Sequence, residues 1–304
     1  MNRGDIHREA KGRSSVSVVG LGNWGSSLVN ALRAAGAPLR EIVVRSEAAA
    51  VRERRRLRRT GGPRIATLAE AELDAEFLWL CVPDAAIART ARQVARQLAR
   101  RGRGRRAGAA GGQIVLHSSG ALSRAILAPL GRHGLATASA HPLMSFPGRD
   151  PVSIEGVGFA VEAEPPVRRR IATLVRRIGG RPFRIDGEAK ALYHAAGAMA
   201  SPLLVAHLAA AEEAAALAGI APRRARQLIG AIARASLENA IRQGAERSFS
   251  GPFARGDSGT VLLHLQALGA HPFLDGVYRG SARYALEGLP IRRRRALLQA
   301  LNRA

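Results

Sequence analysis

The first half of the chain alternates short apolar runs with longer stretches whose apolar residues recur at helical spacing. Short apolar runs bounded by glycine, proline or polar residues are typical of buried strands, and their alternation with helices is typical of a parallel α/β sheet. The pattern predicts strands at residues 16–20, 41–45, 77–83, 113–119, 135–142, 157–163 and 181–186.

After Asp186 the strand pattern stops, and the remaining sequence is typical of helices. Gly219 and Pro222 separate two long helical stretches, because glycine favours a helix end and proline a helix start. Shorter helices are expected at 260–268 and 275–287. We predict a disordered tail at 1–13, an α/β domain at 14–186 and an all-helical domain at 187–304, with a flexible loop in the low-complexity stretch at 101–112.

Composition narrows the class of protein. The chain has 304 residues, of which 47% are hydrophobic, and it shows no apolar run of about twenty residues, so no membrane span is expected. The N-terminal residues lack the apolar segment of a signal peptide. Cys81 is the only cysteine, so an internal disulfide is impossible and a reducing cytoplasm is the expected compartment.

The formal net charge of +24 is large enough to attract nucleic acid. The basic residues, however, are spread along helical segments such as VRERRRLRRT and VRRRIATLVRR instead of forming one arm. Aromatic residues, which stack on the bases of single strands, make up only 4% of the chain. Nucleic acid is therefore not the expected partner, and the expected partner is a small molecule.

A glycine-rich turn follows the first predicted strand. In VSVVGLGNWGSS, Gly20, Gly22 and Gly25 have the G-x-G-x-x-G spacing of a dinucleotide-binding turn, with a strand before it and an amphipathic helix after it. The start of that helix offers free N–H groups to phosphates. We therefore predict a mostly parallel Rossmann-type sheet in the first domain, with Leu21, Asn23 and Trp24 beside the cofactor.

The end of the second predicted strand points to the form of the cofactor. An acidic residue there would bind the ribose 2′-hydroxyl of NAD, but Arg45 and Ser46 stand in its place. A guanidinium and a hydroxyl suit the 2′-phosphate of NADP. Val82 and Pro83, at the end of a later strand, are expected to border the same cofactor, while Asp84 is as well explained as a helix cap.

Polar residues at two further strand ends are candidates for substrate contacts, because ligands of open parallel sheets bind at the carboxyl ends of the strands. These residues are Ser118, Ser119 and Gly120 in HSSGAL, and His141 in AHPLM. The alternatives are that one of the serines caps the next helix and that His141 is a buried histidine with a structural role.

The stretch GEAKALYHAAGAMASPL holds a lysine in a chain that otherwise uses arginine almost everywhere. On one continuous helix Lys190, His194, Gly197 and Ser201 would share a face. A desolvated lysine can lose a proton in an accessible pH range, whereas arginine cannot, so Lys190 is the candidate general acid, with His194 assisting. The alternative is an ion pair at the helix start, for instance with Asp186.

A last group of candidates lies at SGPFARGDSGTVLLHL. A helix is predicted to begin near Thr260, and its free N–H groups, with Asp257, are candidates for holding a substrate carboxylate. Asp257 could equally pair with Arg255 and have no part in binding.

The motifs GLGNWG, VPDAAI, HSSGAL, HPLMSF, KALYHAAGAMAS and GPFARGDSGTVLLHL follow one another in most of the chain. In this combination the chain resembles an uncharacterised Rossmann-like family with a C-terminal domain of unknown function, number 2520. The family is similar in layout to pyrroline-5-carboxylate reductase, ketopantoate reductase and the β-hydroxyacid dehydrogenases. The resemblance implies NADP-linked hydride transfer at a C=O or C=N bond, and dimers formed through the helical domain.

In the β-hydroxyacid dehydrogenases a helix lysine and an asparagine four residues later act on the substrate oxygen. Lys190 matches that lysine, His194 stands where the asparagine would be, and Ser119–Gly120 resembles the serine-glycine turn of those enzymes. The expected function is an NADP(H)-dependent oxidoreductase acting on a small, carboxylated carbonyl or imine compound. The alternative is an NADP-binding sensor or scaffold without catalysis.

Overall fold

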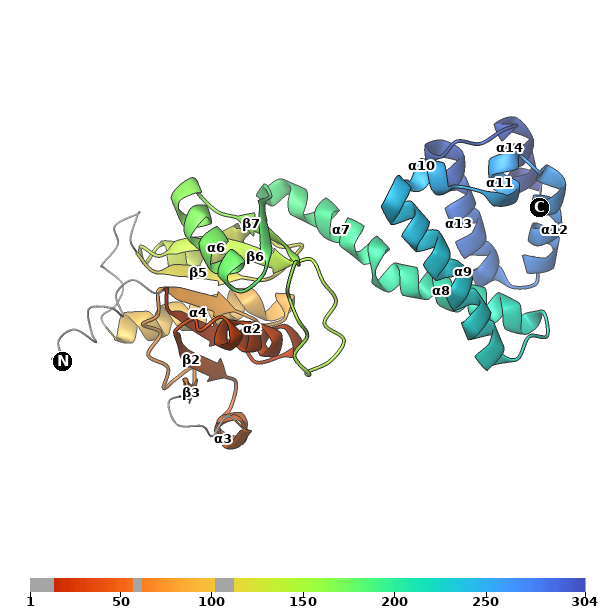
Figure 1. Cartoon of the computed structure of the whole chain (residues 1–304). Helices are drawn as coiled ribbons and strands as arrows, with labels where there is room; N and C mark the ends of the chain where they lie inside the picture. Colours follow the sequence, from red (N-terminus) through yellow and green to blue (C-terminus); the bar gives the residue numbers. More distant parts are fainter. Residues whose placement is uncertain (1–13, 57–61, 102–111, 304) are drawn as a thin grey trace. The chain divides into compact units, whose positions relative to one another are not determined.

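The computed structural model describes residues 14–56, 62–101 and 112–303 (Figure 1). The expected tail at 1–13 and nearly all of the expected loop at 101–112 lie outside these residues. The chain forms two compact units that divide between Ala198 and Met199. Each unit is described by itself below.

The first unit is built on an eight-stranded sheet with the order β3-β2-β1-β4-β5-β6-β7-β8. All neighbouring strands pair in parallel except β6 and β7, which are antiparallel. The strands are β1 (Val16–Val19), β2 (Leu39–Val44), β3 (Arg64–Thr67), β4 (Phe77–Leu80), β5 (Ile114–His117), β6 (Ala136–Pro142), β7 (Gly158–Glu162) and β8 (Arg181–Arg184). The predicted fold class, a mostly parallel sheet followed by helices, is confirmed.

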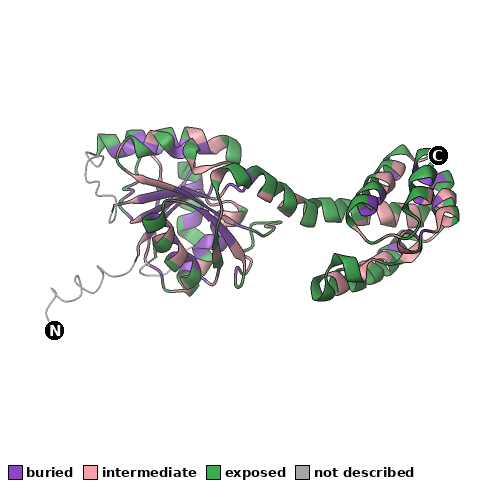
Figure 2. Ribbon diagram, turned by 90° about the horizontal axis from the view of Figure 1, so that it is seen from above, coloured by how far each residue is buried: buried purple, intermediate pink, exposed green. Residues whose placement is uncertain are grey.

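Two apolar layers cover the two faces of this sheet, since successive side chains of a strand point to opposite faces. Figure 2 shows the buried residues concentrated along the strands. Helices α2 (Asn23–Ala34), α3 (Glu47–Arg56) and α6 (Pro165–Arg177) contribute buried residues to one layer, and α4 (Asp84–Arg100) and the short α5 (Ala128–Gly131) to the other. Every residue of β4 is fully buried, as expected for a central strand covered on both faces.

Short helical turns complete the first unit. The 3-10 turn η2 (Arg124–Leu127) precedes α5, and η3 (Gly187–Ala189) leads into α7 (Lys190–Ala200). Lys190, the first residue of α7, is fully buried in this unit. The compact unit therefore continues past residue 186, where the strand pattern ends.

The second unit consists of helices among its described residues. They are α8 (Pro202–Leu217), α9 (Pro222–Gln243), α10 (Ala245–Ser248), α11 (Gly251–Arg255), α12 (Ser258–Leu268), α13 (Pro272–Gly288) and α14 (Arg294–Arg303). Its apolar core is small and joins α12, α13 and α14 through residues such as Val261, Leu265, Leu286 and Leu297. Helix α8 has no buried residue, and α9 has one in 22, Ala225.

One helical stretch of the described residues, Gly187–Leu217, is long and apolar enough to cross a membrane by length and composition alone. The expectation that the chain has no such stretch was therefore too strict. None of the residues in its most apolar window is buried, and two features distinguish the stretch from a continuous apolar helix. Lys190 near the start is enclosed among polar groups, and the helix is interrupted at Ser201, whose backbone angles of −129° and −88° are not helical.

Candidate active site

The glycine-rich turn joins β1 to α2, and each of its three glycines meets a different surrounding. Gly20 has a φ of +102°, and a Cβ there would lie 2.5 Å from the Cys81 carbonyl oxygen. A Cβ on Gly25 would lie 2.2 Å from the Gly20 carbonyl oxygen, whereas a Cβ on Gly22 would meet nothing within 4 Å. Gly20 and Gly25 thus permit the turn, and Gly22 leaves open space beside the start of α2, which fits the approach of a dinucleotide phosphate.

The side chains of this turn do not all face that open space. Asn23 donates from its side-chain amide to the Phe146 carbonyl at 2.9 Å, and Leu21 packs against the apolar core. The ring of Trp24 packs against Trp79 and Phe146. The Trp24 indole is therefore turned to the aromatic neighbours, and the group of Trp24 that could bind a phosphate is its backbone N–H at the helix start.

The residues expected on the cofactor's other side lie at the ends of neighbouring strands. Arg45 is exposed directly after β2, and the Ser46 hydroxyl accepts from the Ala49 N–H at 3.3 Å at the start of α3. Val82 is half-buried, with its Cγ1 close to Gly20, and Pro83 is exposed where α4 begins. Arg45 is thus free to meet an anionic group in solvent, while Ser46 has a helix-capping contact of its own.

The turn after β5 is the centre of a polar cluster. The Ser119 hydroxyl donates to the Asp84 carboxylate at 2.7 Å and accepts from the Leu122 N–H at 3.0 Å. His117 is fully buried, and its Nδ1 accepts from the Ser119 N–H at 3.1 Å, so its Nε2 donates to the Ser123 carbonyl at 3.3 Å. Burial lowers the pKa of His117 to about 4, which keeps this histidine neutral. Its two hydrogen bonds stabilise the turn.

Lys190 lies directly against this turn. Its ammonium donates to the Ser119 carbonyl at 2.9 Å and to the Ser139 hydroxyl at 2.7 Å, and the side chain has 0% exposure. Ser139 in turn donates to Glu162 at 3.2 Å. Burial lowers the pKa of Lys190 to about 8, although the carboxylates of Glu162 and Asp84 act in the opposite direction.

The ion pair considered for Lys190 is not formed with Asp186: the Lys190 ammonium donates to Ser119 and Ser139, and the Asp186 carboxylate accepts from Arg184 at 2.8 Å. A lysine can be enclosed in this place since two oxygens accept from its ammonium and two carboxylates compensate its charge. The enclosed ammonium therefore belongs to the polar cluster at the carboxyl ends of β5 and β6.

One phenol ring and two imidazoles cover the outer side of the turn. The Tyr193 hydroxyl and Nδ1 of His141 form a hydrogen bond of 2.9 Å, and the rings of His141 and His194 meet edge to face at 5.5 Å. A Cβ on Gly120 would lie 2.3 Å from Cδ2 of His194 and 2.8 Å from Nε2 of His141. Gly120 thus allows both imidazoles to lie against the backbone.

These groups differ in exposure and in charge. His194 is exposed, whereas His141 and Tyr193 are half-buried. Burial, reinforced by His194 and Lys190, lowers the pKa of His141 to about 4, and burial raises the pKa of Tyr193 to about 12. At neutral pH His141 is therefore uncharged, Tyr193 keeps its proton, and Lys190 holds a positive charge beneath them.

Ser118, the other serine of the turn, makes different contacts. Its hydroxyl oxygen accepts from the indole N–H of Trp24 and from the indole N–H of Trp79, each at 2.7 Å. The structure thus brings together Ser118, Ser119, Gly120, His141, Lys190 and His194. Sequence reasoning missed the contributions of Trp79, Ser139, Glu162 and Tyr193, and for Asp84 it weighed a place beside the cofactor against helix capping but not a contact with Ser119.

The remaining predicted residues belong to the second unit. Ser201 lies outside α7, which ends at Ala200, so the helix face predicted to run from Lys190 to Ser201 is interrupted. Asp257 accepts from the Thr260 N–H at 3.0 Å and from its hydroxyl at 2.7 Å. These contacts are those of a helix cap, and they occupy the two donors of Thr260 that were expected to hold a substrate carboxylate.

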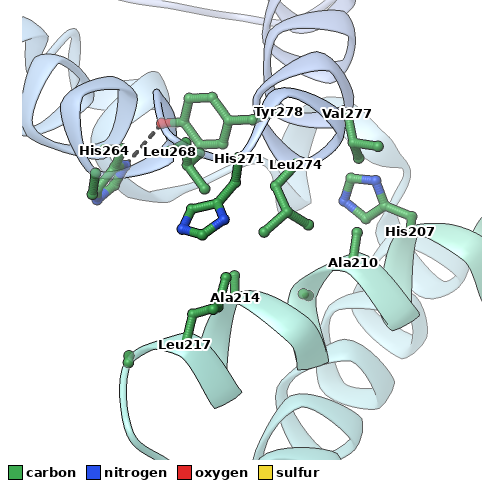
Figure 3. Close-up of a pocket in the computed structure, with 13 residues that line it drawn as sticks. His207, Ala210, Ala214, Leu217, His264, Leu268, His271, Leu274, Val277 and Tyr278 are labelled. Carbon is green, nitrogen blue, oxygen red and sulfur yellow. Dashed lines mark hydrogen bonds between the residues drawn. The ribbon is translucent and has the colours of Figure 1, made fainter.

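The second unit contains a cavity of about 530 Å³ (Figure 3). Its walls come from α8, α12 and α13, and they are mainly alanine and leucine with three imidazoles, His207, His264 and His271. His264 is tied to the Tyr278 hydroxyl at 2.8 Å. Among the described residues no group of three or more His, Cys, Asp or Glu side chains could hold a metal ion.

Two family models match the sequence. Residues 2–142 match the model of a Rossmann-like domain, and residues 157–285 match that of a domain of unknown function, DUF2520. No curated protein matches the sequence.

Several solved structures share the fold. Protein TM1727 from Thermotoga maritima is 20% identical, with 94% of this chain and 98% of that chain covered and a TM-score of 0.67. The reductive aminase from Aspergillus terreus in complex with NADPH and ethyl-5-oxohexanoate is 15% identical, with 94% and 99% covered and a TM-score of 0.61. The pyrroline carboxylate reductase of Plasmodium falciparum with NADP bound is 12% identical, with 95% of each chain covered and a TM-score of 0.54.

At these identities the likeness is one of fold. The family content comes from the two matched models: a Rossmann-like domain over residues 2–142 and the domain of unknown function DUF2520 over residues 157–285.

Proposed function

We propose that this protein is an NADP(H)-dependent oxidoreductase that transfers a hydride to or from a small carbonyl or imine compound. The observation that carries the proposal is the fully buried Lys190 ammonium at the carboxyl ends of parallel strands, in the same sheet unit as a glycine turn with open space at Gly22. Solved structures with this fold include a reductive aminase with NADPH and a pyrroline carboxylate reductase with NADP.

The residues present fit a nicotinamide dinucleotide. The backbone from Gly20 to Gly25 would hold the pyrophosphate, because Gly22 leaves space beside the free N–H groups of the α2 start. Arg45, exposed at the end of β2, would bind the 2′-phosphate and so favour NADP over NAD. The bound cofactor would supply the hydride. The protein would orient the substrate, donate the proton and stabilise the charge that develops on the substrate.

In the direction of reduction, the substrate carbon gains the hydride and its oxygen or nitrogen gains a proton. We assign to Lys190 the positive charge at the site and the proton that the substrate oxygen or nitrogen gains. Its ammonium is fixed under the turn by the Ser119 carbonyl and the Ser139 hydroxyl. A positive charge in a water-poor interior stabilises negative charge that develops nearby. His194 lies on the exposed side of the same turn and is the group we expect to contact the substrate.

The expectation of a carboxylated substrate rested on the start of α12, where Asp257 now occupies the donors of Thr260. We therefore define the substrate class by its C=O or C=N bond alone. The experiment is to measure NADPH binding and then NADPH oxidation with a panel of keto acids, aldehydes, ketones and cyclic imines.

The variants Lys190→Ala and Lys190→Met should abolish turnover with at least one of these compounds, while NADPH binding persists. Arg184→Ala is the matched control, because it removes an exposed cation at the end of β8 that pairs with Asp186. NADPH binding without turnover of any compound, unchanged by either Lys190 variant, would instead favour the sensor or scaffold.

We also propose that the protein is a homodimer formed through α8 and α9. A helix that is apolar all round is normally buried, yet α8 has no buried residue, and Leu203, Val205, Ile232 and Ile241 on α8 and α9 are more than half exposed. Light scattering should give twice the chain mass. Ile241→Glu should shift the protein to monomers, whereas Val51→Glu on α3 of the first unit should leave the dimer intact.

A further inference from the structure

We propose that the Ser118 hydroxyl can only donate a hydrogen bond to a ligand, because two tryptophan indoles occupy its acceptor positions. It would bind a carbonyl oxygen of the ligand in the active site. The inference rests on the proposed function, because the oxygen belongs either to the nicotinamide carboxamide or to the carbonyl substrate. In both cases the chemistry recognised is an oxygen acceptor with no hydrogen of its own.

The argument begins with the two indoles. Nε1 of Trp24 and Nε1 of Trp79 each lie 2.7 Å from the Ser118 hydroxyl oxygen. An indole N–H can only donate, and a hydroxyl oxygen has two lone pairs, so both acceptor positions of Ser118 are occupied. Its own hydrogen remains, and among the described residues none accepts it. Ser118 can therefore only donate to a ligand.

Both indoles are held rigidly. Trp79 is fully buried on β4, and Trp24 packs on it edge to face with ring centroids 6.0 Å apart. Trp24 also contacts Phe146 at 5.1 Å and Phe159 at 5.9 Å. The position of the hydroxyl is thus fixed by the apolar core. Accepting two hydrogen bonds also polarises the O–H bond and strengthens it as a donor.

The hydroxyl stands where a ligand of this fold is expected. Ser118 follows β5 directly, Trp24 belongs to the start of α2 after the glycine turn, and β4 lies between β1 and β5 in the sheet. Ligands of open α/β sheets bind outside the carboxyl ends of the strands, at the point where the strand order reverses. Here that point lies between β1 and β4, and Ser118 is half-buried beside it.

The neighbouring serine does not share this property. The Ser119 hydroxyl already donates to Asp84 and accepts from the Leu122 N–H, so it is satisfied within the protein. The two adjacent serines thus have separate tasks. Ser119 fixes the turn over Lys190, and Ser118 presents a free donor to the ligand, with Trp24 and Trp79 as its positioning residues.

The chain contains two tryptophans, so its indole N–H groups give two NMR cross-peaks, and both report on Ser118. In the free protein Ser118→Ala should shift both cross-peaks, and the control Ser153→Ala, in an exposed loop, should shift neither. In the wild-type protein NADP⁺, either alone or together with pyruvate, should shift the Trp79 cross-peak, whereas 2′,5′-ADP, which lacks the nicotinamide, should not. In Ser118→Ala the NADP⁺-dependent shift of Trp79 should disappear.

Two titrations distinguish which oxygen Ser118 binds. A Trp79 shift with NADP⁺ alone assigns the carboxamide, and a shift that needs NADP⁺ with pyruvate, the smallest keto acid, assigns the substrate carbonyl. Ser118→Ala should weaken binding of the responsible ligand roughly tenfold, and Ser118→Thr, which keeps the hydroxyl, should restore most of it. This second variant separates a lost hydrogen bond from a misfolded turn.

The inference is overturned if neither arm shifts Trp79 although NADP⁺ binds, or if Ser118→Ala binds both ligands as tightly as the wild type does. Failure of the proposed function gives a different result, because NADP⁺ then fails to bind in calorimetry at all. In that case the ligand assignment falls with it, while the free-protein spectra still test the arrangement of the two indoles.

Discussion

Raising the pH through about 8 should remove the charge from Lys190 and, with it, the proposed reductase activity. Burial lowers the pKa of Lys190 to about 8 from an ordinary value of 10.5. A group with that pKa is roughly nine-tenths protonated one unit below it and roughly one-tenth protonated one unit above it. We therefore expect kcat/KM for reduction to fall about tenfold between pH 7 and pH 9, and about tenfold per unit beyond.

Three neighbouring titratable groups should not produce this decline in kcat/KM. The pKa of His141 and that of His117 are lowered to about 4, and the pKa of Tyr193 is raised to about 12, so all three keep their charge states in this range. Unfolding linked to Lys190 does not produce it either. Because its pKa is lower in the folded protein, the unfolded chain binds more protons between pH 8 and 10.5, and the contribution of Lys190 to stability rises there.

The assay is the initial rate of NADPH oxidation, with saturating NADPH and the best compound of the panel, at pH values from about 6 to 10. Lys190→Arg is the matched variant, because a guanidinium keeps its charge throughout this range. Whatever activity this variant retains should show no decline above pH 8. A wild-type kcat/KM that stays constant from pH 7 to pH 10, or the same decline above pH 8 in Lys190→Arg, would refute the role given to Lys190.

Three other changes test separate parts of the site and the fold. Arg45→Ala should raise the Kd of NADPH by roughly tenfold and leave that of NADH within about twofold, because the guanidinium is assigned to the 2′-phosphate; equal losses would contradict the assignment. Gly120→Ala should abolish turnover without weakening NADPH binding, since its Cβ would lie 2.3 Å from Cδ2 of His194, and an unchanged kcat would speak against the site. Glu41→Gln should lower the free energy of unfolding by about 1–3 kcal/mol in urea titrations, because the buried carboxylate accepts from the N–H groups of Glu72 and Leu73; an unchanged midpoint would contradict this.

The strands were largely predictable because buried strands of a parallel sheet are apolar on both faces. FLWL at 77–80 and IVLH at 114–117 leave almost no other interpretation, and both are fully buried. β3, with the sequence RIAT, was missed because its apolar run has only two residues, Ile65 and Ala66. Its place at the edge of the sheet follows from pairing with β2, which local sequence does not specify.

The candidate site was predictable as far as single strand ends reveal it. The rule that ligands of open sheets bind at the carboxyl ends of the strands located Ser118, Ser119 and His141, because polar residues at or directly after the end of a strand are visible in the sequence. Ser139 and Glu162 were missed, since their meeting depends on the antiparallel pairing of β6 with β7, where the two residues lie opposite each other. A polar residue within a buried strand was the available signal, but it does not identify its partner.

The use of lysine at position 190, in a chain that otherwise places arginine at nearly every basic position, now has a structural reason. The side chain has 0% exposure and two oxygen acceptors, the Ser119 carbonyl and the Ser139 hydroxyl. A guanidinium presents five N–H donors in a flat fork, so an arginine there would bring more donors than these two oxygens can satisfy, and an unpaired buried donor costs about 1–3 kcal/mol. An ammonium is compact, and desolvation can bring its pKa close to neutral, which a guanidinium does not allow. The same enclosure that requires a lysine here therefore also gives it a proton that can be transferred.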